Sequence, residues 1–364
     1  MWIDKAKETM TSKERVIKTF KHEKTDRVPI DYATNPTIHH KLCQALGIQD
    51  DNYLLLYEAL GVDYREIWPK YTGPLIYPEI EGCKVNPEYG FYTRWIANQS
   101  GGYEDFCHYP LKDADEEKIR AFPFPSPDDY DYETALNQME KFKNYGVYVG
   151  HPGIGDIINS TGRVMGMEDA LVNLLMEDEA TLSYVEQKLC VEFGVMERLL
   201  DKGKGKVDFV FLGEDLGTQI APMISLEMYR RVIKPNQKKF VDLAASYNLP
   251  VMIHTCGSSS WAYEDFIEIG VQAVDALQPE AANMSPRYLK DHFGGRLSFH
   301  GCISTAGPLA YGTREEVIED VKKTLSIMMP GGGYHFAPTH QIQDNSPVEN
   351  VIAMYQAAHT YGVY

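Results

Sequence analysis

Apolar residues in the second half of the chain fall into two alternating patterns. Short continuous runs are typical of buried parallel strands, and longer stretches with a repeat of three to four residues are typical of helices. The expected strands lie at 147–150, 207–212, 251–254, 274–277, 297–300 and 334–337. The expected helices lie at 156–203, 226–247, 260–269, 286–293, 314–328 and 347–361. Because alternating strands and helices need right-handed parallel crossovers, this pattern predicts an α/β fold.

The start of the chain adds two strands to this count. Thr11 and Glu14 form a T-x-x-E capping box before an apolar helical stripe, which predicts an N-terminal helical extension. Apolar runs at 28–32 and 64–68 predict two further strands. Eight alternating strands favour a closed (β/α)8 TIM barrel over an open sheet, and no G-x-G-x-x-G follows the first strand. We therefore expect one domain over 1–364.

Residues 70–130 interrupt this regular pattern. They are rich in Pro, Gly and Tyr and have little periodicity, and the stretch at 122–129 (FPFPSPDD) is typical of a stiff, extended connector. We expect an irregular insertion here. Whether it covers the site as a lid is left open by the sequence.

Composition and charge limit the classes of partner. Of the 364 residues, 44% are apolar and 24% are charged, which fits a globular enzyme and excludes a disordered or fibrous chain. The net charge of −17 argues against nucleic acid and anionic membranes, because a phosphate binder needs a basic face. A small-molecule substrate remains, and the oligomeric state is left open.

Targeting signals and cysteines indicate the compartment. No run approaches the ~20 apolar residues of a membrane helix, and the segment MWIDKAKETMTSKERV has no apolar core of a secretory signal. The six cysteines are sparse and irregularly spaced. We therefore expect a cytoplasmic protein with reduced thiols, in which a special cysteine is a ligand or nucleophile.

Polar residues follow the expected strands at the end where barrel enzymes place their active sites. Although far apart in sequence, they would converge on one rim. The candidates are Glu214, Asp215, His254, Cys256, Gln278, His300, Cys302, Thr339, His340, Gln341 and Gln343.

The pair His254-x-Cys256 gives the sharpest chemical signal among them. An imidazole and a thiolate two residues apart at a strand end can face one centre, and both are ligand types that Zn²⁺ prefers. His340, Cys302 and His300 are candidates for the third ligand. The alternative is a buried cysteine beside a hydrogen-bonded histidine.

Other candidates have weaker signals. Glu214 and Asp215 could be an acid–base pair, metal ligands or a substrate clamp, or else an acidic pair at the N-terminus of the next helix. Tyr32, Asn35 and His151 follow strands and are candidates for binding substrate. The 24 tyrosines suit a pocket for a flat ring, although scattered core and surface positions account for most of them.

Several sequence blocks resemble the uroporphyrinogen decarboxylase superfamily. The likeness covers nearly the whole chain and is weakest over 70–130. The blocks are MTSKERV (10–16), DRVP (26–29), GEDLGTQ (213–219), HTCG (254–257), APTHQIQ (337–343) and PVEN (347–350). The resemblance implies a single (β/α)8 barrel with the active site at the C-terminal ends of its strands.

This superfamily contains two chemistries. True uroporphyrinogen decarboxylases are cofactor-free and carry an early R-Q-A-G-R motif that binds substrate carboxylates, whereas residues 30–36 here read IDYATNP and contain no arginine. The other branch consists of corrinoid-dependent zinc methyltransferases, whose signature is H-x-C plus a later cysteine. His254 and Cys256 match it, the later cysteine falls on His340, and a family glutamate falls on Gln278.

The resemblance implies a zinc-dependent methyltransferase. It would move a methyl group between a methoxylated compound or a thiol and cobalamin carried by a corrinoid protein. His254, Cys256 and His340 would hold Zn²⁺, and Glu214 or Asp215 would orient substrate or move a proton. Gln278, His300 and Gln343 would line the pocket. A His/Cys/His set is less anionic than His/Cys/Cys, so it suits polarising an ether oxygen, as in O-demethylation.

Two other functions stay open at the level of the sequence. The first alternative is a cofactor-free decarboxylase of tetrapyrrole acids, in which Asp215 or Asp31 stabilises charge on a pyrrole nitrogen and His340 contacts a carboxylate. The second is a binding protein that keeps the barrel without its chemistry.

Overall fold

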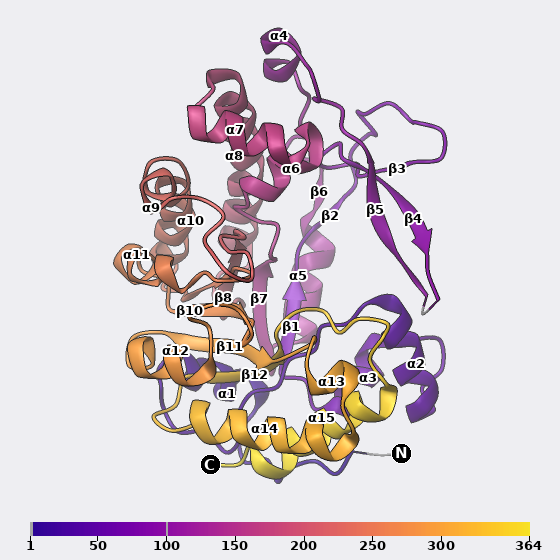
Figure 1. The fold of residues 1–364 in the computed structure, drawn as a ribbon, viewed down its shortest axis with the longest axis vertical. Coiled ribbons are helices and arrows are strands. Elements are labelled where there is room, and N and C mark those ends of the chain that lie inside the picture. Colours follow the sequence, from indigo (N-terminus) through magenta and orange to yellow (C-terminus); the bar gives the residue numbers. More distant parts are fainter. Residues whose placement is uncertain (1–2, 100) are drawn as a thin grey trace.

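Seven parallel strands form the centre of the protein in a computed structural model that describes residues 3–99 and 101–364 (Figure 1). Each strand pairs in parallel with its neighbours. In spatial order they are β1 (Tyr64–Ile67), β7 (Gly146–Gly150), β8 (Phe209–Gly213), β9 (Val251–His254), β10 (Ala273–Leu277), β11 (Ser298–Ile303) and β12 (Tyr334–Pro338). The strands expected from 64–68 onwards are thus confirmed, in a curled parallel sheet within an α/β fold.

Helices follow the strands as the apolar repeats predict. They are α6 (Ile158–Met165), α7 (Met167–Met176), α8 (Glu179–Lys202), α10 (Lys234–Ser246), α11 (Tyr263–Ile269), α12 (Pro286–Phe293), α13 (Pro308–Tyr311), α14 (Arg314–Met328) and α15 (Val348–Tyr361). A short helix, α9 (Leu226–Met228), and a π-helical turn (Tyr229–Ile233) lead into α10, where one continuous helix was expected. None of the helices among the described residues is long and apolar enough to span a membrane.

Helix α1 (Ser12–Phe20) packs against the N-terminal ends of the strands. The expected capping box between Thr11 and Glu14 is present. Val16 and Phe20 join an apolar cluster inside the curl, whose other members are Tyr64, Tyr148, Phe209, Phe211, Met252 and Ala273. Because these side chains come from β1, β7, β8, β9 and β10, the sheet must curve around them. Its opposite end, where the strands terminate, is left for the site.

The run at 28–32, expected as the first strand, makes only one isolated bridge. Ile30 pairs with Phe336 of β12, and the Asp63 N–H donates to the Ile30 carbonyl. Pro29 has no N–H to give to a ladder, and the Ile30 N–H donates instead to the Asp63 carboxylate at 2.7 Å. The segment therefore lies between β12 and the start of β1 without forming a regular strand.

Residues 70–130, expected as an irregular insertion, contain short regular elements between their loops. The region contains a three-stranded antiparallel sheet of β3 (Lys84–Val85), β4 (Tyr92–Ala97) and β5 (Gly102–His108) beside the main body (Figure 1). It also contains helix α4 (Glu116–Arg120), and β2 (Lys70–Tyr71) pairs with β6 (Tyr130–Asp131). Exposed aromatic residues such as Trp95 and Tyr103 conceal the alternation that normally marks a strand.

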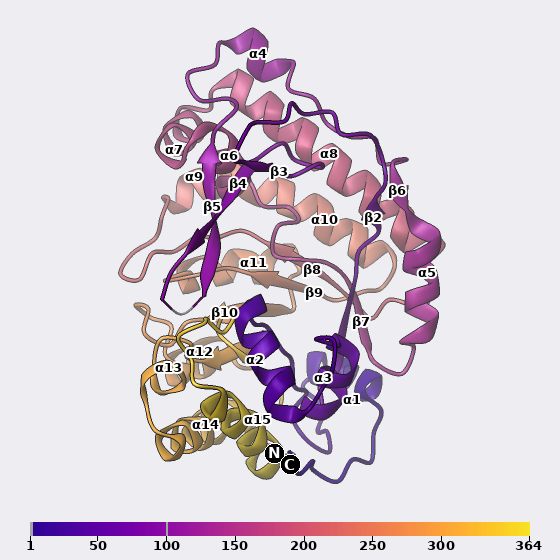
Figure 2. The same cartoon turned by 90° about the vertical axis from the view of Figure 1, so that its right-hand side faces the viewer.

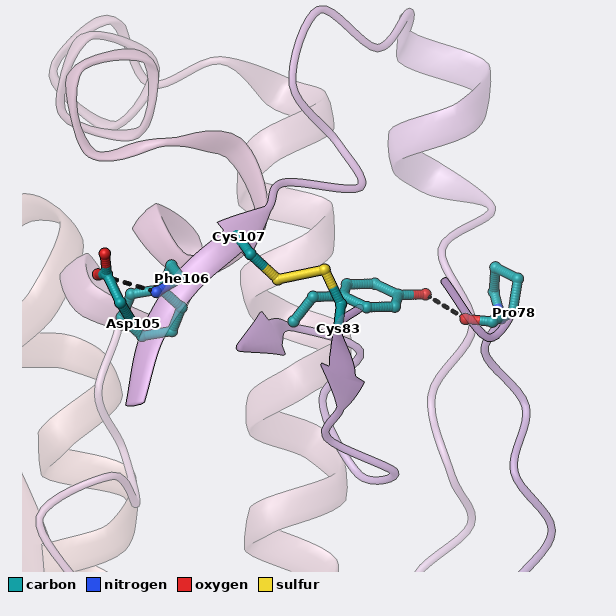
Figure 3. The surroundings of a disulfide bond; sticks show 6 residues. Pro78, Cys83, Asp105, Phe106 and Cys107 are labelled. Atoms are coloured by element: carbon teal, nitrogen blue, oxygen red, sulfur yellow. Dashed lines mark hydrogen bonds between the residues drawn. A yellow bond between two sulfur atoms is a disulfide. The ribbon is translucent and has the colours of Figure 1, made fainter. Parts of the chain in front are cut away.

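Cys83 and Cys107 form a disulfide within this insertion, which corrects the expectation of six reduced thiols (Figure 3). The antiparallel pairing of β3, β4 and β5 brings the two Cα atoms to 6.6 Å from each other, although they are 24 positions apart in sequence. Close by, the Tyr92 hydroxyl donates to the Pro78 carbonyl at 2.7 Å. The remaining cysteines, Cys43, Cys190, Cys256 and Cys302, are free.

Two further helices cover the edge of the sheet that carries β1. They are α2 (Pro36–Leu46) and α3 (Tyr53–Leu60). A separate helix, α5 (Tyr132–Lys141), precedes β7 in the chain. Both α2 and α3 end at a glycine with a left-handed backbone. In the view of Figure 2 they lie on the side that faces the reader, next to α15. Their position brings the first turn of α3 close to the C-terminal ends of the strands.

Candidate metal centre and cavity

A cavity of about 350 Å³ lies at the C-terminal ends of the strands. Its wall is formed by strand ends, by the segment after residue 30 and by α3. The lining residues are Asp31, Tyr32, Ala33, Thr34, Tyr53, Tyr57, Glu66, Tyr148, Pro152, Phe211, His254, Asp275, His300, Ala337, Pro338, Thr339, His340 and Gln341. Each of the seven strands of the sheet contributes a residue to this one space.

His254, Cys256 and His340 come together at the cavity. One ligand atom from each lies within 4.8 Å of the other two, and Cys256 Sγ is 3.3 Å from His254 Nε2. Donors around a tetrahedral zinc ion with bonds of about 2.0–2.3 Å lie roughly 3.3–3.8 Å apart. The three donors therefore fit one ion after small side-chain shifts, and one thiolate with two imidazoles is a donor set that zinc accepts.

Asp275 orients the first of these ligands. His254 Nδ1 lies 2.5 Å from Asp275 Oδ2, so the ring donates through Nδ1 and leaves the Nε2 lone pair facing Cys256. A carboxylate partner of this kind fixes the tautomer and raises the basicity of a ligating imidazole. Asp275 is therefore part of the centre even though it touches no metal-binding position itself.

The hydrogen bonds continue from Asp275 across the cavity. His300 Nδ1 donates to Asp275 Oδ1 at 2.6 Å, and His300 Nε2 donates to Asp31 Oδ2 at 3.1 Å. Burial alone would lower the pKa of His300, but the two carboxylates raise it to about 9. Burial would likewise raise the pKa of Asp275, and its two histidines instead hold that pKa well below the usual range. His300 is thus an imidazolium at neutral pH.

The two acidic residues after β8 have different surroundings. Glu214 is fully buried outside the cavity wall, where its oxygens accept the Ile157 and Ile158 N–H groups at 2.8 and 3.1 Å. This carboxylate supports the N-terminus of α6, which precedes it in the chain, and not that of the next helix. Asp215 accepts the Cys256 N–H at 2.9 Å, and its Oδ1 lies 3.6 Å from His254 Nε2. Only Asp215 is therefore close enough to act at the centre.

Of the residues expected to bind substrate, the structure brings Tyr32 and His300 to the cavity wall. Gln278 instead accepts the Gly257 N–H at 2.5 Å and so supports the loop that carries Cys256. Asn35 caps α2, and the Gln343 amide donates to the Gln341 carbonyl. These three polar side chains are occupied by backbone groups.

His151 lines a separate cavity of about 170 Å³. Burial and the charges of Lys188 and Arg163 lower its pKa to about 4, so the ring is neutral. Cys302, a candidate third ligand, lies in the main apolar core, where burial raises its pKa.

Sequence reasoning missed Asp275 and Glu66. Asp275 is the one polar residue of the apolar run VDAL (274–277), and Glu66 is the one acidic residue of YREI (64–67), next to Arg65. Both residues lie within strands, at inward-facing positions, whereas the candidates from the sequence lie at or after the strand ends. A lone carboxylate at an inward position of a barrel-type strand is the signal that could have found both.

Comparison with known proteins agrees with this architecture. Residues 203–361 match the family model for uroporphyrinogen decarboxylase (URO-D). No curated protein matches the chain. Among solved structures, a methyltransferase from Methanosarcina mazei is similar, with a TM-score of 0.65 and 16% identity over 97% of this chain and 99% of that one. At this identity the likeness shows a shared fold.

The matched range contains β8 to β12 together with His254, Cys256 and His340. It therefore includes the blocks GEDLGTQ, HTCG and APTHQIQ, on which much of the resemblance rested. The resemblance to the uroporphyrinogen decarboxylase superfamily is confirmed over residues 203–361 by this match.

Proposed function

We propose that this protein is a zinc-dependent methyltransferase that moves a methyl group between a small substrate and cobalamin carried by a corrinoid protein. The observation that carries the proposal is the convergence of His254, Cys256 and His340 at the rim of a cavity of substrate size. The family match and the methyltransferase among the structures of similar fold support it.

The residues of the chain would share the work as follows. His254, Cys256 and His340 would hold the ion, and zinc, when bound, supplies a Lewis acid for an oxygen or sulfur atom of the substrate. Asp275 keeps His254 in the tautomer that can ligate. Asp215 holds the Cys256 backbone in place through its N–H.

The charge of the cavity wall indicates the class of substrate. Among the described lining residues there is no lysine or arginine, whereas Asp31, Glu66 and Asp275 are all present. An anionic thiol would meet like charge here, and so would the carboxylates of a tetrapyrrole acid. We therefore favour a methoxylated compound over a thiol and over the substrate of the decarboxylase alternative.

The position of residues 28–32 suggests how the sheet would close. They lie between β12 and the start of β1, where an eighth strand would complete a (β/α)8 barrel. The corrinoid protein would then approach the C-terminal ends of the strands, because the cavity lies there.

Metal analysis of purified protein tests the proposal. We expect about one zinc per chain in the wild type, loss of zinc in Cys256→Ser, and retention in Cys190→Ser, whose exposed thiol lies on α8 away from the site. Methylation of cobalamin by a methoxylated compound should disappear with the metal. A wild-type protein without metal, or with full methyl transfer after zinc removal, would overturn the proposal.

A further inference from the structure

Glu66 is the one acidic residue of the cavity wall whose charge no residue balances among those that the structure describes. Asp31 and Asp275 share His300 between them. Glu66 accepts a hydrogen bond from a neutral group, the Tyr148 hydroxyl, which donates to Oε2 at 3.4 Å. Since a charge that a ligand would cover in the cavity is costly unless it is paired, this carboxylate favours a ligand that brings the opposite charge.

The position of Glu66 in β1 directs it into the cavity. Its strand neighbours Tyr64, Arg65 and Ile67 are buried, and Glu66 alone is exposed. The strand is the edge strand of the sheet and pairs Glu66 with Tyr148 of β7, and both side chains line the cavity. Desolvation by the surrounding wall, with help from Asp31, raises the pKa of Glu66 to about 7.

Aromatic rings line the same cavity. Tyr32, Tyr53, Tyr57, Tyr148 and Phe211 all line it. Tyr57 packs edge-on against Tyr32 and Tyr53, with centroid distances of 5.6 and 6.0 Å. Tyrosine and phenylalanine faces attract organic cations, and such sites commonly combine rings with a carboxylate.

The chemistry of the wall favours a cation over a neutral ring as the ligand. A neutral aromatic ether would bury the Glu66 carboxyl without any compensating charge, at a cost in desolvation. An ammonium group would pair with that carboxylate and at the same time contact the tyrosine faces. Arg65, which stacks on Tyr57 at 4.9 Å, is buried in β1 and does not line the cavity.

We propose that the substrate carries a cationic ammonium group at the end remote from the transferred methyl group, and that Glu66 and the surrounding tyrosines bind this end. The proposal rests on the proposed function, since it takes the metal centre as the place of the methyl group. It assigns Glu66 the role of a specificity-determining residue. The substrate class is then a methyl ether of an amino or quaternary ammonium alcohol.

Direct binding measurements test this without metal or cobalamin. The probes are (2-methoxyethyl)trimethylammonium and its neutral carbon isostere, 1-methoxy-3,3-dimethylbutane, titrated into the full chain by calorimetry or ligand-observed NMR. We expect the cation to bind about tenfold more tightly than the isostere. Glu66→Gln should abolish the preference, whereas Glu58→Gln, an exposed carboxylate on α3, should keep it.

The same titration with Cys256→Ser separates the two proposals. Retained preference for the cation in a variant without zinc would support the role of Glu66 whatever the outcome for methyl transfer. Equal affinity for both probes, no binding of either, or an unchanged preference in Glu66→Gln would each overturn the inference. Circular dichroism of each variant shows that the chain is folded.

Discussion

At the scale of single residues, the arrangement around Asp275 determines the character of the site. One carboxylate accepts from His254 on one side and His300 on the other, and His300 reaches on to Asp31. Asp275 therefore connects the orientation of His254 to the charged His300, which lines the cavity. A substitution at Asp275 should therefore weaken metal binding, although Asp275 is not itself one of the three candidate ligands.

Replacement of Asp275 by Asn tests this connection. The amide can accept from only one histidine, so His254 is expected to lose its fixed tautomer and zinc affinity to fall by roughly 10- to 100-fold. Chelator competition measures the affinity. Asp320→Asn, on α14 outside the cavity wall, is the control and should leave it unchanged. An Asp275→Asn variant that binds zinc as tightly as the wild type would show that the contact does not orient the ligand.

At the scale of elements, α1 is held to the rest of the molecule by ionic contacts. The buried Arg15 side chain pairs with Asp26 and with Asp63, at 2.7 and 2.6 Å. Burial alone would raise the pKa of Asp26, but Arg15 and the Thr9 and Met10 N–H groups bring it well below the usual range. A lowered native pKa means that this carboxylate stabilises the fold above its unfolded pKa, near 3.9, and that the contribution is lost as pH falls.

The substitution Asp26→Asn is therefore expected to be destabilising in a pH-dependent manner. At pH 7 it should lower the free energy of unfolding by about 3 kcal/mol, because the buried Arg15 side chain loses its two charge-assisted hydrogen bonds to Asp26 and keeps the one to Asp63. Below about pH 4 the difference from wild type should shrink, because Asp26 then becomes protonated in the unfolded chain while it stays ionised in the folded one. Urea unfolding at pH 7 and pH 3 measures both values. The exposed pair partner Asp291 gives the control, since Asp291→Asn should change stability by less than about 0.5 kcal/mol.

Elements with a clear apolar period were predictable from the sequence, and the others were not. Helices α12 and α14 begin and end where the pattern places them, and β9 does so too. The π-helical turn at Tyr229–Ile233 leaves the apolar spacing almost unchanged, so the sequence predicts one continuous helix there. In the three-stranded sheet of the insertion, exposed aromatics remove the period-two signal altogether.

The site was predictable to the extent that it depends on the ends of strands. His254 ends β9, Cys256 and His340 follow strands, and their approach to one another comes from parallel topology. Glu214 and Asp215 are adjacent in sequence, and only the position of α6 decides that the first caps a helix while the second faces the centre. Such an outcome depends on tertiary packing, which local pattern does not contain.

The Cys83–Cys107 disulfide can be tested by counting free thiols. Titration of the unfolded, unreduced protein with a thiol reagent should find four thiols, those of Cys43, Cys190, Cys256 and Cys302, and six after reduction. Metal should be removed beforehand, so that Cys256 is free to react. Six thiols before reduction would agree instead with the sequence-based expectation of reduced cysteines.

At the scale of the whole molecule, the order of the strands separates β1 from the rest. From β7 to β12, each strand pairs with the next strand along the chain, after a single crossover. β1 pairs with β7 only after the chain has passed through residues 68–145, which include the insertion. Closing so long a connection costs more chain entropy than closing a crossover, although the cost grows slowly with length.

This separation has a consequence for the order of folding. The sheet from β7 to β12 can assemble from neighbouring segments, whereas β1 must join it across a large gap in sequence and is expected to dock late and open first. Native-state hydrogen exchange should therefore show lower opening free energies for the amides of β1 than for those of β9. Since β1 carries Glu66, the wall that meets the substrate would be the last part of the cavity to form, and a bound cation would slow its opening.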